Sequence, residues 1–217
     1  MNTRREFFET LFKLITGTGV FLGSLALPIC RAYSNAETII LPRGTERESL
    51  IDKDPKSLDT GNLEITPLKD FGTMGLTDFE VNIKEWRLGV AGKVKTPLQL
   101  TYSEILSLPS VEKNVLLICP GFFSNYGRWQ GVSMKDLLSR AVMERGVTHI
   151  IIYSGPEGAY KKEFPVADVL ANRVFLAYRV NGETLPIRDG YPLRVVAEGY
   201  YGSDWIKYVS KVSVGRD

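Results

Sequence analysis

Apolar and polar residues alternate in several stretches of the chain, with the period of two that is typical of half-buried strands. After residue 78 the alternation recurs at intervals, separated by glycine, proline and asparagine, which favour turns. Five segments are therefore expected to be strands: residues 79–90, 147–153, 174–180, 193–197 and 209–214.

Helices are expected where the apolar residues no longer alternate and are spaced three or four residues apart. Thr101 and Glu104 have the spacing of a capping box, so a short helix should begin there and stop before Pro109. Ser133 is expected to cap a second helix that ends near Gly146. Residues 164–170 form a third short helical piece, and Asn181-Gly182 is the strongest short signal for a hairpin turn. The predicted class is α+β, with strand-rich mixed sheets and a few short helices.

The first 36 residues have a different composition. Arg4 and Arg5 precede a moderately apolar stretch at 11–28, and the small residues Ser34-Asn35-Ala36 follow it. This order resembles a twin-arginine export signal, which implies the twin-arginine machinery as a partner and the periplasm as the location. A membrane anchor retained after export is the alternative. We expect an export segment at 1–36, an extended polar arm at 37–75 and a folded domain at 76–217.

The charge balance argues against a nucleic acid as the partner. The whole chain has 27 basic and 25 acidic residues, and residues 1–36 hold four basic and two acidic ones. The remainder therefore carries 23 of each sign, so it has no general basic field that could attract phosphates.

Cys119 is the strongest single candidate for chemistry. It ends the apolar run 115–118 and is followed by Pro120-Gly121, so the sulfur is expected at the end of a buried strand. A buried, inert thiol is the simplest explanation of such a residue taken alone. After residue 36 the chain has one cysteine, Cys119, and one histidine, His149, and these two cannot form a tetrahedral zinc site or an iron–sulfur cluster. If the domain binds a metal, most donors must come from a ligand that is not protein.

Several short motifs occur in a particular order around Cys119. They share no single diagnostic signature, but their sequence along the chain is specific: Trp86-Arg-Leu-Gly-Val-Ala-Gly92, Cys119, Trp129-Gln-Gly131, Asn181-Gly182, Gly190-Tyr-Pro-Leu-Arg194, Tyr201-Gly202 and Ile206-Lys207-Tyr208. In this order they resemble the molybdopterin-binding domain of the sulfite oxidase family, which includes sulfite oxidases and an exported methionine-sulfoxide reductase subunit. The resemblance covers residues 76–214.

The resemblance implies a molybdenum–molybdopterin cofactor and a role for each matching position. Cys119 matches the thiolate that ligates the metal, and Arg194 and Lys207 match residues that hold the pterin phosphate, for which a guanidinium fork is well suited. The other implied cofactor-binding positions are Trp129, Ser154, Asp189, Trp205 and Ile206. Tyr201 matches an aromatic residue near the metal in some relatives. Arg128 is placed beside the substrate only because it lies close to Cys119 in the sequence.

Two departures from the family pattern bear on function. Asp189 stands where relatives carry Asn or His, and only Arg128 can be named for the arginine cluster that sulfite oxidases place around their substrate. The chain also has no Cys-x-x-Cys-His motif for a haem. A separate electron-transfer partner, a cytochrome or a membrane haem or quinone protein, is therefore expected.

The resemblance implies an oxidoreductase that transfers an oxo group to or from a small S- or N-centred substrate. Sulfoxide or N-oxide reduction and sulfite oxidation are both compatible with it, because a fold does not specify a substrate. The alternative is a cofactor-free periplasmic binding or assembly protein that retains the fold. The joint presence of Cys119, Arg194 and Lys207 favours the enzyme.

Overall fold

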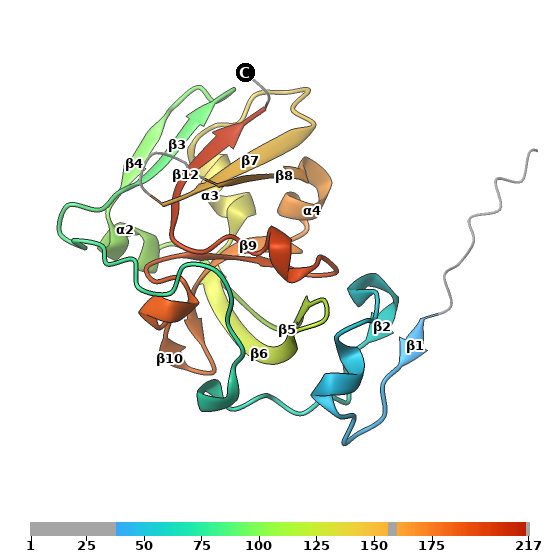
Figure 1. The fold of residues 1–217 in the computed structure, drawn as a ribbon. Helices are drawn as coiled ribbons and strands as arrows, with labels where there is room; N and C mark the ends of the chain where they lie inside the picture. The colour runs from blue at the N-terminus through green and yellow to red at the C-terminus, as the bar shows by residue number, and fades with distance from the viewer. Residues whose placement is uncertain (1–37, 156–159, 216–217) are drawn as a thin grey trace, which may run out of the picture. The chain divides into compact units, whose positions relative to one another are not determined.

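Two five-stranded sheets form the body of the protein. The computed structural model, drawn in Figure 1, describes residues 38–155 and 160–215. The first sheet is antiparallel and contains β5 (Ser110–Cys119), β6 (Phe123–Val132), β9 (Val174–Val180), β10 (Glu183–Thr184) and β11 (Arg194–Ala197). Its order is β10-β9-β6-β5, and β11 also pairs with β9.

The second sheet is mixed. It has the order β4-β3-β12-β7-β8 and contains β3 (Leu88–Gly92), β4 (Leu98–Leu100), β7 (His149–Ser154), β8 (Lys161–Pro165) and β12 (Val209–Val214). β12 runs parallel to β3, whereas its other neighbour, β7, is antiparallel. The main hydrophobic core draws on both sheets and includes Leu117, Trp129, Ile152, Val195 and Val212. The α+β class predicted from the sequence is confirmed.

Within the described residues three short α-helices accompany the sheets: α2 (Tyr102–Leu106), α3 (Met134–Arg140) and α4 (Val166–Leu170). The capping box of α2 forms as predicted, because the Thr101 hydroxyl accepts from the Glu104 amide and the Glu104 carboxylate accepts from the Thr101 amide. Ser133 caps α3, also as predicted. The β9–β10 turn has the expected left-handed Asn181 and Gly182, with φ of 54° and 86°.

Three local predictions are wrong. Phe164 and Pro165, expected to begin the third helical piece, belong to β8, and α4 begins only at Val166. Residues 79–87 form no strand, although their apolar residues alternate, because no neighbouring strand pairs with them. Helix α3 ends at Arg140, several residues before Gly146. The two residues that follow its last turn are bonded to another loop: the Lys95 amide donates to Val142 O and the Thr96 amide donates to Ala141 O. Tertiary contacts therefore terminate this helix before the glycine is reached.

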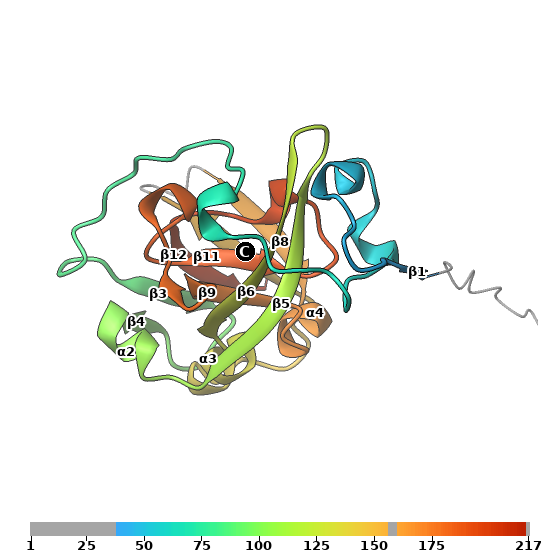
Figure 2. The same ribbon diagram turned by 90° about the horizontal axis from the view of Figure 1, so that it is seen from below.

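The long β5–β6 hairpin dominates the view in Figure 2, where its turn lies beside the N-terminal segment drawn in blue. Cys119 pairs with Phe123 at the turn, and Ser110 pairs with Val132 at the other end. Gly121 adopts a φ of 75° in the connection, a left-handed conformation that glycine reaches without steric cost. The chain thus reverses directly after the cysteine, as the Pro120-Gly121 pair predicts.

The segment before residue 72 runs along this hairpin. It contains β1 (Ile39–Ile40) and β2 (Leu58–Asp59), which pair in parallel, and the 3-10 helices η1 (Arg47–Leu50), η2 (Pro55–Ser57) and η3 (Leu68–Asp70). Leu41 and Leu50 pack in a small cluster with Leu116, Ile118 and Tyr126 of the hairpin. The export segment expected at residues 1–36 lies outside the described residues. Among the described residues, no helix is both long and apolar enough to span a membrane.

Candidate active site

One cavity of about 510 Å³ gathers the ends of several strands and the loops that follow them. Cys119 reaches it from the end of β5, Ser154 from the end of β7 and Arg194 from the start of β11. The loop between β11 and β12 adds another wall, which includes the 3-10 helix η6 (Gly202–Asp204). Strands from both sheets therefore converge on one site.

Cys119 is a half-buried free thiol, and burial raises its pKa above the ordinary value for cysteine. Without a metal the sulfur is therefore protonated at neutral pH. The backbone holds it in place, because the Cys119 carbonyl accepts from the Phe122 amide at 3.0 Å. Gly202 passes close by: a Cβ atom there would lie 3.5 Å from the Cys119 Cβ.

Arg194 is a buried cation between two indole rings. Its guanidinium lies 5.5 Å from the Trp129 ring centre and 5.7 Å from that of Trp205. One terminal nitrogen donates to the Asp189 carbonyl at 3.1 Å, whereas Nε has no hydrogen-bond partner among the described residues. Burial lowers the pKa of Arg194 to about 10, partly opposed by the nearby Asp189 carboxylate. The side chain remains cationic at neutral pH, held by cation–π contacts.

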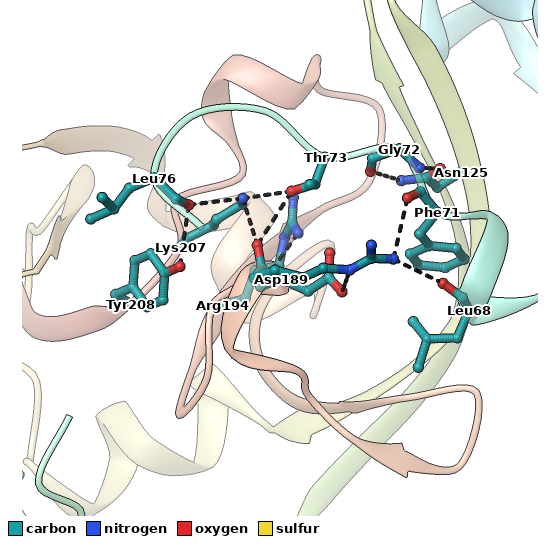
Figure 3. A network of polar contacts seen from close by, with 11 residues as sticks. Leu68, Phe71, Gly72, Thr73, Leu76, Asn125, Asp189, Arg194, Lys207 and Tyr208 are labelled. Carbon is teal, nitrogen blue, oxygen red and sulfur yellow. Dashed lines mark hydrogen bonds and ion pairs between the residues drawn. The ribbon is translucent and has the colours of Figure 1, made fainter. Parts of the chain in front are cut away.

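Lys207 supplies a second cation, and its position depends on a glycine. Its ammonium donates to Arg188 O at 2.7 Å, Thr73 Oγ1 at 2.6 Å and Leu76 O at 3.1 Å, as Figure 3 shows. Burial lowers the pKa of Lys207 to about 8, and the charge of Arg194 acts in the same direction. Gly190 has a φ of 112°, and a Cβ atom there would lie 3.0 Å from Lys207 Cα. A side chain at position 190 would therefore push the Lys207 backbone away from residue 190.

Asp189 lies behind these cations and does not line the cavity. It is 1% exposed, and neither carboxylate oxygen has a hydrogen-bond partner among the described residues. Its nearest ionic contact is Arg188 Nε, 3.5 Å from Oδ2. A buried carboxylate so weakly bonded is unusual, and the surrounding cations Arg188, Arg194 and Lys207 supply its electrostatic compensation.

A segment of the N-terminal arm crosses the cavity. We call residues 72–76 the strap. At one end the Gly72 amide donates to Asn125 Oδ1 at 2.9 Å, and the Asn125 side chain donates back to Gly72 O at 2.8 Å. At the other end Leu76 O accepts from Lys207 and from the Tyr208 hydroxyl at 3.2 Å. Both anchors are visible in Figure 3.

The structure brings together six of the residues singled out in the sequence. All six line the cavity: Cys119, Ser154, Arg194, Trp205, Ile206 and Lys207. Trp129 is fully buried behind Arg194 and donates its indole N–H to Val115 O at 3.2 Å. Tyr201 is 37% exposed and is not part of the lining, although its backbone bridges to Ile118 next to the cysteine.

Arg128 is the exception, because the expectation that it lies beside Cys119 is wrong. The β5–β6 hairpin folds back on itself, so Arg128 pairs with Asn114, five pairs away from Cys119 and Phe123. At about 3.3 Å per residue this places it roughly 17 Å along the strand from the cysteine. Arg128 instead lines a separate cavity with Lys69, Asn181 and Glu183.

Sequence reasoning missed the apolar part of the lining. Phe122, Phe123 and Tyr160 line the same cavity, and so do Met74 and Leu76 of the strap. Phe122 and Phe123 directly follow the Cys119-Pro-Gly turn, so their proximity could have been inferred from that turn. Met74 gave no such signal, because it lies in a polar arm 45 residues before the cysteine.

Comparison with known proteins defines the class. Residues 75–217 match the family model of the oxidoreductase molybdopterin binding domain, so the chain belongs to this family. It is a molybdopterin-binding oxidoreductase domain of the sulfite oxidase type, and its cofactor is molybdenum–molybdopterin.

The individual relatives and the solved structure described next have low sequence identity to this chain. The chain is 26% identical over 183 residues to the protein-methionine-sulfoxide reductase catalytic subunit MsrP of Gluconobacter oxydans, a match that covers 70% of this chain and 58% of that protein. It is 26% identical over 196 residues to an NADH nitrate reductase of Brassica napus, covering 74% of this chain but 21% of the relative. The sulfane dehydrogenase SoxCD of Paracoccus pantotrophus shares the fold, with a TM-score of 0.61 and 19% identity over 93% of this chain and 56% of that one.

The residues around the cavity fit this cofactor. The volume lies within the range of sites that enclose an organic ligand. A thiol, the preferred donor for soft metals, and two cations suited to a phosphate share one lining. The described residues contain no cluster of three His, Cys, Asp or Glu side chains that could hold a metal ion. The metal would therefore be held by the Cys119 thiolate together with sulfur donors of the cofactor itself.

Proposed function

We propose that the protein is an exported, molybdopterin-dependent oxidoreductase that transfers an oxo group to or from a small S- or N-centred substrate. The observation that carries this proposal is the single cavity shared by Cys119, Arg194 and Lys207. A thiol, a buried guanidinium and a partly buried ammonium in one cavity suit a metal-bearing, phosphate-bearing cofactor.

The roles of the residues follow from their chemistry. The cofactor supplies two-electron oxo-transfer chemistry when bound. The Cys119 sulfur would bind the metal as a thiolate, because a coordinated thiol loses its proton even where burial raises its pKa. Arg194 and Lys207 would neutralise the phosphate, and Trp205, which packs against Arg194, keeps that guanidinium in position.

Oxo transfer to the substrate releases electrons and oxo transfer from it consumes them, so either reaction needs a separate electron-transfer protein. Reduction of a sulfoxide or N-oxide consumes two electrons and two protons, and it releases water with the thioether or amine. Oxidation of sulfite takes oxygen from water and releases two electrons and two protons with the sulfate. We propose that a cytochrome or a membrane haem or quinone protein exchanges these electrons. Export through the twin-arginine route to the periplasm is supported by Arg4-Arg5 and the apolar stretch after them.

Purification from a host that makes molybdopterin tests the proposal. We expect about one molybdenum per chain, a metal–thiolate charge-transfer absorption, and turnover of sulfoxides, N-oxides or sulfite with an artificial electron mediator. Cys119→Ser should lose the absorption and the turnover. Cys30→Ser, which removes the other cysteine of the chain, is the matched control and should keep both. A wild-type protein that folds normally but contains no molybdenum would contradict the proposal.

A further inference from the structure

The side chain of Met74 lies next to the thiol of Cys119. Its sulfur lies 3.9 Å from the Cys119 sulfur, and both residues line the same cavity. Met74 is 45% exposed, so its side chain borders the open part of the cavity and is not packed into the core. A group bound next to the Cys119 sulfur therefore has the Met74 thioether as a neighbour.

The strap holds Met74 there from both sides. The paired hydrogen bonds of Gly72 with Asn125 fix its beginning, and the bonds of Lys207 and Tyr208 to Leu76 O fix its end. Gly72 also packs so tightly on the Phe123 ring that a Cβ atom would lie 2.3 Å from it. Because hydrogen bonds hold the strap both before and after Met74, this residue has little freedom to move away from Cys119.

The cations around the cavity either have other partners or, as with Arg194 and Lys207, are the ones assigned to the cofactor phosphate. Arg194 lies between two indole rings, and Lys207 uses its ammonium on three acceptors. Lys162 forms an ion pair with Asp204 at 3.0 Å, and the Lys161 ammonium lies over the Tyr153 ring. The lining residues that contact Cys119 or neighbour it in the hairpin turn include Met74, Pro120, Phe122, Phe123 and Gly202, and none of them is charged. An anionic substrate would meet no cationic side chain among these residues and would lose its hydration there.

We infer that Met74 is a specificity-determining residue: fixed over Cys119 by the strap, it makes the substrate position apolar and uncharged, so that neutral oxides are accepted and inorganic anions are disfavoured. This inference rests on the proposed function and narrows its substrate class. A polarisable thioether suits contact with a neutral organic sulfur or nitrogen oxide, whereas a guanidinium at the same position would suit sulfite.

The test adds one positive charge at two positions of the full-length, cofactor-loaded protein. Met74→Arg places a guanidinium beside the cysteine, and Leu106→Arg places the same charge on helix α2, at a side chain that is 42% exposed and does not line the cavity. The measured quantity is kcat/KM for sulfite, with an electron acceptor, divided by kcat/KM for a neutral dialkyl sulfoxide, with an electron donor. We expect Met74→Arg to raise this ratio about tenfold or more, the effect of one nearby, partly screened charge. Leu106→Arg should change it much less, and Met74→Leu should keep it.

A second measurement does not depend on turnover. Sulfite added to the oxidised protein should perturb the metal–thiolate absorption at a lower concentration in Met74→Arg than in wild type, while the molybdenum content of both stays the same. An active wild type that prefers sulfite, or equal ratios in the two arginine variants, would overturn the inference but leave the proposed function intact. A wild type without molybdenum or turnover would remove the proposed function itself.

Discussion

Asp189 and Arg194 form a buried electrostatic pair whose cost to the fold can be measured. Burial lowers the pKa of Arg194 from 12.5 to about 10, which corresponds to roughly 3 kcal/mol against the charged form. Arg194→Met removes that penalty but also removes two ring contacts and a hydrogen bond, each about 1 kcal/mol. The substitution also takes away one of the positive charges that compensate the buried Asp189 carboxylate. We therefore expect the single variant to be less stable than wild type by about 2 kcal/mol.

A double-mutant cycle isolates the interaction. Asp189→Asn should also destabilise, but in the Arg194→Met background it should recover part of the loss, with a coupling free energy of about 2 kcal/mol. The assay is urea unfolding of the four cofactor-free proteins, together with the molybdopterin content of the same four after loading. Both variants that lack Arg194 should bind less cofactor, even where stability is regained.

An exposed ion pair provides the control for this cycle. Lys113 and Glu198 lie 3.0 Å apart, with side chains 32% and 44% exposed, so their coupling should be below about 1 kcal/mol. A coupling between Asp189 and Arg194 that is no larger than the control, or full cofactor content without Arg194, would refute this reasoning. The first result would mean that the buried charges do not interact, and the second that Arg194 does not hold the cofactor.

Two further predictions concern single groups in the cavity. Sulfate, whose charge is constant near neutral pH, should bind the cofactor-free protein more weakly as the pH rises through about 8, because Lys207 is charged below its pKa and neutral above it. Arg194 keeps its charge across that range, so calorimetric titration of Lys207→Met should show no such step. Alkylation of Cys119 should have a pH midpoint above that of a small-molecule thiol, since burial raises its pKa, and bound cofactor should block it.

Each of these two predictions has a clear contrary result. A pH step in sulfate affinity that survives Lys207→Met would assign the titration to another group. An alkylation midpoint at or below the ordinary cysteine pKa would mean that the thiol is activated in the absence of metal, and Cys30→Ser is used throughout so that only Cys119 is labelled.

Local sequence signals determined much of this protein. The capping box at Thr101, the Asn181-Gly182 turn and the end of β5 at Pro120-Gly121 all formed as predicted, because each depends on the backbone preferences of a few adjacent residues. Strands β9 and β12 have the predicted bounds, since apolar runs between turn residues specify them. The order of motifs also identified the family and its cofactor.

Tertiary structure alone decided how distant segments meet. β6 contains Ser124, Asn125 and two glycines, so no apolar pattern marks it as a buried strand. Its pairing with β5 carries Arg128 away from the cysteine, although the two are only nine residues apart in the sequence. The strap reaches the same cysteine from the polar arm through hydrogen bonds to Asn125, Lys207 and Tyr208. Such contacts depend on strand register and on bonds between remote residues, and neither is encoded in the preferences of neighbouring residues.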